Sequence, residues 1–214
     1  MTSPTSPTSP TAPTSARVSP AEQTRAARVG AVLFRYRGFL PVPFLLIPLL
    51  VPGVQTRRGW EIGAFFILAG EAFRLAGVSA AGTVTRRRSR AVQRLVTYGI
   101  FAWMRNPLYV GNLLIWLGFV IGSGLLWFLP VALALFALEY SLIVRYEEGV
   151  LESIFGSEYV EYKRRTPRWL PRPPKLVATG EHDWREALRS EVSTFAQYAA
   201  LAAAFWIKAR FLSS

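Results

Sequence analysis

The chain has 214 residues, of which 51% are hydrophobic and 18% are charged, and its mean hydropathy is +0.26. Soluble domains carry about 25% charged residues, so this composition favours a membrane protein. The net charge of +12 then indicates cytoplasmic loops and anionic lipid rather than nucleic acid. The lack of cysteine and the single histidine exclude disulfides and multi-histidine metal sites, so no metal is expected.

The N-terminal segment is repetitive and poor in apolar residues. Residues 2–15 spell TSPTSPTSPTAPTS, and a proline at every third position prevents helix formation. No basic region precedes an apolar run, so a secretory signal is not expected. The sequence predicts a disordered tail over residues 1–20, a membrane domain over 21–191 and a C-terminal apolar helix over 192–214.

Three apolar runs are expected to cross the membrane singly. Gly38–Val54 contains four prolines, which predict a bent or broken helix whose released carbonyls are satisfied by neighbours. Gly59–Gly82 is the second run, and Val192–Ile207 is the last. Glu71 and Arg74 in the second run share a helix face, so we expect them to pair inside the bundle.

A further apolar run is long enough for a hairpin. Asn106–Leu138 has no charged residue over 33 positions, about 50 Å as one helix and too long for a hydrocarbon core of roughly 30 Å. A GSG turn at 122–124 divides it into arms at 107–121 and 125–146. The sequence therefore predicts an all-α, polytopic membrane bundle of about five transmembrane helices.

Lysine and arginine are distributed unevenly between the two ends of these spans. With a cytoplasmic N-terminus, 20 of them lie on that side, four lie outside and Arg74 is buried. The positive-inside rule then places the N-terminus and the polar segments 83–106 and 145–190 on the cytoplasmic side. The four outside are Arg57, Arg58, Lys208 and Arg210.

Two motifs flank the hairpin. LVTYGIFAWMRNPLYVGN, residues 95–112, leads into it, and RYEEGVLESIFGSEYVEYKRRTPRWLP, residues 145–171, leaves it. The hairpin brings the membrane-proximal ends of both segments together. We therefore expect one cytoplasmic cluster, made up of Arg105, Asn106, Tyr109, Glu147 and Glu148.

These motifs resemble those of the isoprenylcysteine carboxyl methyltransferase and phospholipid methyltransferase family. Its members carry GxYxxxRHPxYxG, a helical hairpin and then EExxLxxxFGxxYxxYxxxxPRxxP, and the chain keeps every spacing over a motif core at residues 95–171. The resemblance implies an integral membrane enzyme that uses S-adenosylmethionine as methyl donor. Two positions depart from the family pattern: Phe101 replaces a tyrosine, and Asn106 replaces a histidine and cannot act as a general base.

The resemblance also assigns residues to the donor and to catalysis. Carboxylates suit the ammonium or ribose diol of the donor, Arg105 suits its carboxylate, and aromatic rings suit its adenine. The implied catalytic residues are Arg105, Asn106, Tyr109 and Glu148. The implied donor-binding residues are Leu95, Val96, Gly99, Phe101, Arg105, Asn106, Pro107, Tyr109, Gly111, Glu147 and Glu148.

The expected acceptor is lipid-borne or buried in the membrane, and carries a carboxylate or an amine. A carboxylate needs no base, whereas an amine must lose a proton to Glu148 or Tyr109. The alternative is a non-enzymatic carrier or scaffold, suggested by Glu61, Glu71 and Arg74 within an apolar run. No nucleic-acid partner is expected, and the sequence leaves the oligomeric state open.

Simpler interpretations exist for several of these residues. Asn106 and Pro107 are a usual cap and first position of a helix, and Gly156 is a usual bend. Tyr159 and Tyr162 fit an amphipathic interfacial helix. The single histidine, His182, is expected at the surface.

Overall fold

The computed structural model describes residues 25–39, 41–82, 94–174 and 179–211, and within them all regular secondary structure is helical. The all-α prediction is thus confirmed for this part of the chain, whereas the tail predicted over residues 1–20 lies outside it. The elements are α1 (Arg25–Tyr36), α2 (Pro41–Leu50), α3 (Arg57–Ala81), α4 (Ile100–Trp103), α5 (Pro107–Gly122), the 3-10 turn η3 (Leu126–Phe128), α6 (Leu129–Phe155), α7 (Ser157–Arg165) and α8 (Trp184–Phe211).

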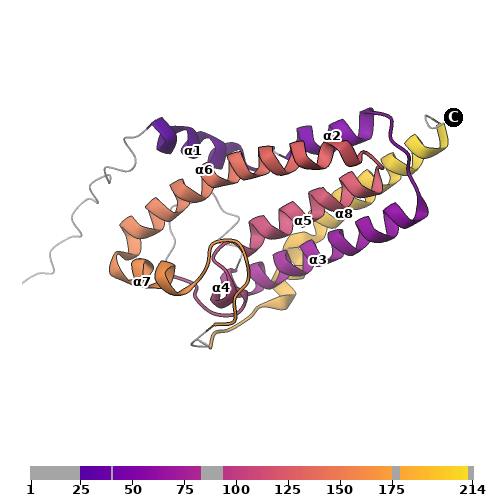
Figure 1. Cartoon of the computed structure of the whole chain (residues 1–214). Coiled ribbons are helices and arrows are strands. Elements are labelled where there is room, and N and C mark those ends of the chain that lie inside the picture. The colour runs from indigo at the N-terminus through magenta and orange to yellow at the C-terminus, as the bar shows by residue number, and fades with distance from the viewer. Residues whose placement is uncertain (1–24, 40, 83–93, 175–178, 212–214) are drawn as a thin grey trace, which may run out of the picture.

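The long helices α3, α5, α6 and α8 run side by side as an elongated bundle (Figure 1). α1 packs along α6, α2 packs against α5, and α3 is packed between α5 and α8. The short helices α4 and α7 lie at the end of the bundle where α3 and α6 finish. This end therefore gathers the polar segments that flank the hairpin.

α3 and α5 pack unusually closely because glycines face each other across their contact. A Cβ on Gly63 would lie 2.5 Å from the carbonyl oxygen of Gly118, and one on Gly70 would lie 2.5 Å from that of Gly111. Each pair of glycines is seven residues apart on its own helix, so they recur on one face every two turns. Small residues at such a face let the two backbones approach, as in membrane helix pairs.

The predicted hairpin and its turns are confirmed. α5 ends at Gly122, and the chain turns through Gly124, whose φ of 73° lies in the left-handed region that glycine tolerates. α6 continues to Phe155, nine residues beyond the arm expected to end at 146, and the predicted bend follows at Gly156 with φ 54°. The second arm is therefore longer than expected.

The predicted pair of Glu71 and Arg74 forms and belongs to a larger network. Arg74 Nε lies 3.3 Å from Glu71 Oε2, and its Nη2 donates to Glu191 of α8 at 2.9 and 3.0 Å. Arg74 also donates to Asn112 of α5 at 2.6 Å, and Tyr198 of α8 donates to Glu71 at 3.0 Å. The network joins α3, α5 and α8, and Glu191 is fully buried within it.

Two helical segments are long and apolar enough to cross a membrane, Arg57–Ala81 and Leu126–Phe155, and α5 is a shorter apolar helix. The expected span at Gly38–Val54 contains a helix of only ten residues, about 15 Å long. The helix is this short because the run contains prolines, which interrupt the hydrogen bonds of a helix. Pro52 cannot donate to the carbonyl of Pro48, which instead accepts a hydrogen bond from Lys208 at 2.7 Å.

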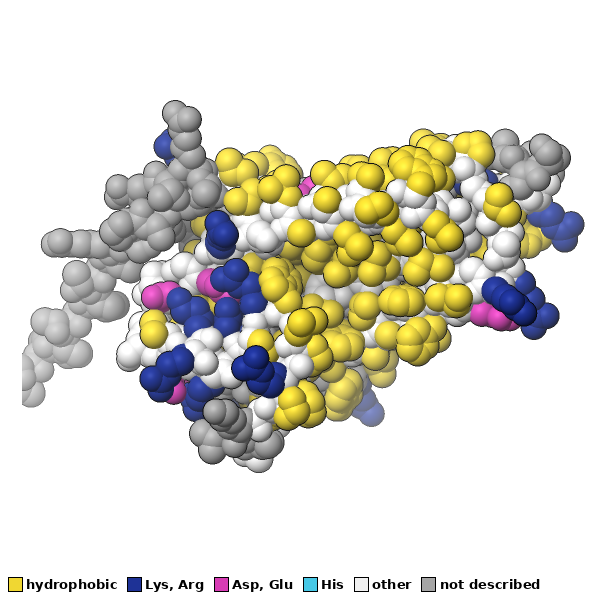
Figure 2. Space-filling model, in the orientation of Figure 1, with side chains coloured by type: hydrophobic (Ala, Val, Ile, Leu, Met, Phe, Trp, Pro, Cys, Tyr) yellow, Lys and Arg dark blue, Asp and Glu magenta, His cyan; other side chains and the backbone are white. Residues whose placement is uncertain are grey.

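The last expected span, Val192–Ile207, is part of α8, which begins earlier at Trp184 and is one continuous helix. The boundary expected at residue 191 therefore falls inside a helix. Hydrophobic side chains cover the visible face of the long helices, while lysine and arginine lie at the ends, most densely around α7 (Figure 2). Three of those around α7 are Lys163, Arg164 and Arg165. The count of five transmembrane helices remains a prediction.

Candidate functional site

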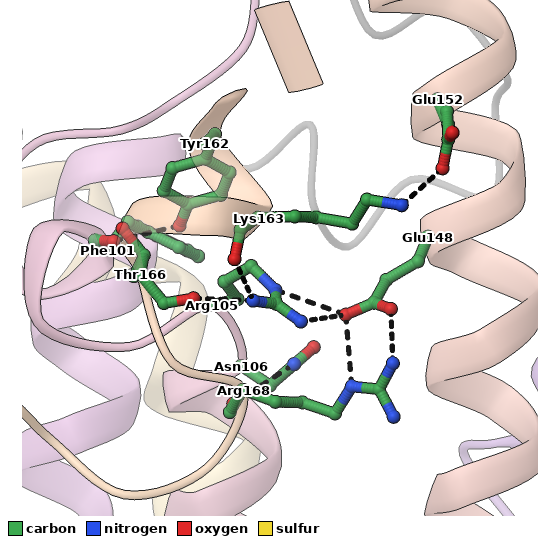
Figure 3. Close-up of polar contacts among 9 residues, drawn as sticks. All are labelled: Phe101, Arg105, Asn106, Glu148, Glu152, Tyr162, Lys163, Thr166 and Arg168. Carbon is green, nitrogen blue, oxygen red and sulfur yellow. Dashed lines mark hydrogen bonds and ion pairs between the residues drawn. The ribbon is translucent and has the colours of Figure 1, made fainter. Parts of the chain in front are cut away.

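A buried glutamate held by two arginines lies at the end of the hairpin (Figure 3). Arg105 donates to Glu148 Oε1 at 2.8 and 3.1 Å, and Arg168 donates to both oxygens of the same carboxylate. Glu148 is only 7% exposed. Such charge-assisted pairs are stronger than neutral hydrogen bonds, so they fix the three side chains relative to one another. Arg105, Glu148 and Arg168 are called the arginine–glutamate cluster below.

The chain on both sides of the hairpin is folded onto this cluster. Arg105 precedes the first turn of α5, and its guanidinium also donates to the carbonyls of Lys163 and Thr166. The backbone N–H of Arg105 donates to the carbonyl of Pro167 at 2.9 Å, and that of Arg172 donates to Trp103 at 3.1 Å. The PRWLP segment therefore lies against the RNPLY turn, as the order of the motifs predicts.

A second pair lies beside the cluster on the same two helices. Tyr109 of α5 donates to Glu147 Oε2 of α6 at 2.8 Å, and Arg37 donates to Glu147 Oε1 at 3.0 Å. The Glu147 side chain is 26% exposed, so it is more accessible than Glu148. The Tyr109 ring packs 4.8 Å from the ring of Tyr140, which leads into the aromatic core. This pair is the more open half of the site.

The amphipathic helix expected at Tyr159 and Tyr162 is α7. Both rings are buried while Lys163, Arg164 and Arg165 follow in its last turn. The Tyr162 hydroxyl donates to the carbonyl of Phe101 at 2.8 Å, which fastens α7 to α4. Burial raises the pKa of this hydroxyl, so it remains a donor at neutral pH.

The structure brings together most of the residues assigned by resemblance. Arg105 meets Glu148, Tyr109 meets Glu147, and Pro107 occupies the first position of α5. Asn106 precedes α5 as expected, but its side chain donates to the carbonyl of Arg168 at 3.2 Å rather than capping the helix. Their roles in binding and catalysis stay predictions.

The remaining assigned positions have structural contacts of their own. Phe101 contributes its carbonyl to Tyr162, and Gly111 packs against Gly70 of α3. Gly99, with φ 59°, lies under the ring of His182. Leu95 and Val96 are partly buried just ahead of this glycine.

Three contact residues were not predicted from the sequence: Arg37, Arg168 and Tyr162. Arg168 and Tyr162 occupy fixed positions of the second motif, so the motif itself held the signal. Arg37 precedes the first apolar run, and no pattern in the sequence links it to Glu147. It reaches that carboxylate because α1 packs along α6.

The geometry limits what each acidic residue can do. Glu148 accepts from Arg105 and Arg168, so both of its carboxylate oxygens are already engaged within the cluster. Glu147 accepts from the Tyr109 hydroxyl and from one arginine, Arg37, at the more open edge of the site. Among the residues that the structure describes, no three His, Cys, Asp or Glu side chains are placed to hold a metal ion.

Comparisons with known proteins point to one family. The sequence model of the phospholipid methyltransferase family matches residues 57–158. The protein-S-isoprenylcysteine O-methyltransferase of Homo sapiens is 34% identical over 117 residues, which are 51% of this chain and 40% of that protein. The protein-S-isoprenylcysteine O-methyltransferase B of Arabidopsis thaliana is 31% identical over 131 residues, which are 56% of this chain and 64% of that protein.

A bacterial protein of a different name is also similar. The cobalt-zinc-cadmium resistance protein CzcN of Cupriavidus metallidurans is 41% identical over 90 residues, 42% of this chain and 40% of its own length. The chain thus spans about 40% of the length of the first of these relatives. No solved structure matches the chain.

The family match begins with α3 and ends inside α7, so it contains the glycine face, the hairpin, Arg105 and both glutamates. The PRWLP segment and α8 lie beyond it. The resemblance indicated by the motifs is confirmed: residues 57–158 of this chain match the phospholipid methyltransferase family, and about half of the chain is similar to protein-S-isoprenylcysteine O-methyltransferases.

Proposed function

We propose that the protein transfers a methyl group from S-adenosylmethionine to a lipid-borne or membrane-buried acceptor at the cytoplasmic end of the bundle. The observation that carries this proposal is the arginine–glutamate cluster, which joins the two family motifs at the open end of the hairpin. The names of the relatives support a methyltransferase whose acceptor is an isoprenylcysteine carboxylate or a phospholipid.

The residues at this end fit the donor chemically. The donor supplies a methyl group that is already activated by a positive sulfur, so the protein must mainly hold donor and acceptor in line. Arginine, carboxylate and aromatic side chains meet here, as a molecule with a carboxylate, an ammonium and a flat base requires. Glu147 is the partly exposed carboxylate among them.

The acceptor would approach from the membrane, between helices. A carboxylate acceptor forms its new C–O bond as the C–S bond breaks, and no proton has to move. An amine acceptor must also lose a proton, and the Tyr109–Glu147 pair is the better placed group because Glu148 is held by two arginines. The Tyr109–Glu147 pair is therefore required as a base only if the acceptor is an amine.

The distribution of charge supports a cytoplasmic location for this end. The described basic residues are densest around α7 (Figure 2), whereas Arg57 and Arg58 begin α3 and Lys208 is near the end of α8, at the opposite end of the bundle (Figure 1). By the positive-inside rule, the richly basic end faces the cytoplasm, where the soluble donor is found. The N-terminus would lie on the same side.

Binding of S-adenosylhomocysteine, the product of the donor, tests the proposal. Calorimetry on the detergent-purified protein is expected to give micromolar affinity, and Glu147→Gln is expected to weaken it about tenfold through loss of a charged partner. Glu158→Gln, an exposed glutamate on α7, is the matched control and should bind like the wild type. Transfer of labelled methyl from the donor into a lipid extract should follow.

Two results of the binding experiment would contradict the proposal. If the folded wild-type protein binds neither the donor nor its product, the family site does not work as a methyltransferase site here. Binding that Glu147→Gln leaves unchanged would instead move the donor away from the Tyr109–Glu147 pair.

A further inference from the structure

α1 carries a pattern of exposed side chains that the proposed site does not use. The apolar side chains of Val29, Val32 and Tyr36 are 49%, 56% and 52% exposed, and they recur at a spacing of three and four residues, so they form one stripe along the helix. Arg28 and Arg35 are exposed as well. Val32 comes four residues after Arg28 and three before Arg35, so the two arginines border the apolar stripe.

The positive charge of this stripe is not neutralised within the part of the chain that the structure describes. α1 contains no acidic residue, and neither Arg28 nor Arg35 forms an ion pair with a described residue. The basic end of α7 differs, because its three basic side chains are paired with Glu152 and Glu161. The arginines of α1 are therefore available to a partner outside the chain.

α1 is packed against α6 so that the stripe faces away from the bundle. A Cβ on Gly30 would lie 2.6 Å from the carbonyl oxygen of Leu142, and the ring of Phe34 lies 5.7 Å from that of Tyr146. Val32 is two residues from both Gly30 and Phe34, so it lies on the opposite side of the helix. The end of α1 is fastened by Arg37, which lies 4.0 Å over the Phe34 ring and donates to Glu147.

The contact with α6 also sets the depth of α1 in a membrane. About 20 residues of helix cross the hydrocarbon core, and Arg145, the first basic residue of the apolar segment Leu126–Phe155, comes about that far into it. Leu142 and Tyr146, which Gly30 approaches, flank this arginine. α1 therefore lies beside the part of α6 that leaves the hydrocarbon core, toward α7 (Figure 1), which is the level of the lipid headgroups.

We propose that the exposed face of α1 binds anionic phospholipids, with the apolar stripe among their chains and Arg28 and Arg35 at their phosphates. Guanidinium groups form strong charge-assisted hydrogen bonds to phosphate, and an apolar stripe bordered by arginine is typical of helices at a membrane interface. A soluble acidic partner would leave the stripe in water, and a second copy of α1 would bring like charges together. The surface goes beyond the proposed function and does not depend on it, since the lipid would bind whether or not a methyl group is transferred.

Fluorescence quenching by brominated lipids tests the proposal on the whole chain in lipid nanodiscs. The chain has no cysteine, so Val32→Cys carries a single fluorophore on the stripe. At equal mole fraction, brominated phosphatidylglycerol is expected to be preferred near the label over brominated phosphatidylcholine by about fivefold or more, the effect of one arginine near an anionic surface. Arg28→Gln combined with Arg35→Gln should remove most of this preference. Arg57→Gln combined with Arg58→Gln, two exposed arginines at the other end of the bundle, is the matched control and should keep it.

Three results would overturn the proposal. Equal quenching by the two lipids with both arginines present would mean that the face does not select anionic headgroups. An unchanged preference in the Arg28→Gln, Arg35→Gln variant would assign the selection to basic residues elsewhere. Quenching by neither lipid, together with a disulfide-linked dimer of unlabelled Val32→Cys, would make the face a contact between two copies of the chain.

Discussion

Glu148 accepts hydrogen bonds from two guanidinium groups, and this pairing explains how a buried carboxylate is stabilised within α6, about two turns before its end. Removing its charge leaves Arg105, whose side chain is 10% exposed, without its anionic partner. Breaking a buried pair in this way costs about 3 kcal/mol. The residue is therefore expected to matter for stability as well as for the site.

We expect Glu148→Gln to lower the melting temperature of the detergent-solubilised protein by about 6–12 °C, which corresponds to that loss in a chain of this size. Glu152→Gln is the matched control, because its partner Lys163 is more exposed and such pairs contribute about 0–1 kcal/mol. A Glu148→Gln variant that melts like the wild type but loses methyl transfer would assign the carboxylate to catalysis instead.

At the scale of helices, the glycine face between α3 and α5 holds the hairpin against the rest of the bundle. Gly70→Ala would place a methyl group 2.5 Å from the carbonyl oxygen of Gly111 and 2.8 Å from Ile115. The helices must then separate. We expect a loss of about 1–3 kcal/mol, measured as a lower melting temperature, because overpacking costs this much.

Gly149→Ala is the control for the melting temperature of Gly70→Ala. Gly149 lies within α6, and a Cβ there meets nothing within 4 Å. Alanine should therefore stabilise the helix by about 0.5–1 kcal/mol through its better helix propensity. If Gly70→Ala also raised the melting temperature, α3 and α5 would not pack as closely at Gly70 as the structure shows.

The elements were predictable where their signals are local. The charge-free run with GSG at its middle predicted α5, the turn and the start of α6, and the spacing of Glu71 and Arg74 predicted their pair. The ion pairs between residues far apart in the sequence were not predictable in full. Arg37, Arg74 and Glu191 find their partners across more than 100 residues or between separate helices, and such pairings depend on packing rather than on spacing.

The C-terminal helix illustrates the same limit. The residues WREALRSE, 184–191, predict a polar helix that leads into the apolar helix from residue 192, but no pattern in the sequence assigns either of them a role. In the folded chain α8 begins at Trp184, and Glu191 on its polar first half pairs with Arg74 deep in the bundle. A buried charge of this kind is interpretable only once its partner is known.

For the whole molecule, the composition of the chain offers a direct way to measure which end of the bundle faces the cytoplasm. It contains no cysteine, so a single introduced cysteine is the sole thiol. Ser157, at the first position of α7, is exposed at the strongly basic end, and Arg58 is exposed at the start of α3. These two positions report on opposite ends of the bundle.

We expect a membrane-impermeant thiol reagent to label Arg58→Cys in intact cells and Ser157→Cys only after the cells are opened. The physical reason is the cost of moving the many basic residues around α7 across the membrane, which holds them on the cytoplasmic side. Labelling of both positions from the same side would mean that α3 does not cross between them. Labelling with the opposite pattern would place the arginine–glutamate cluster outside, away from the intracellular supply of the donor, and would contradict the proposed reaction.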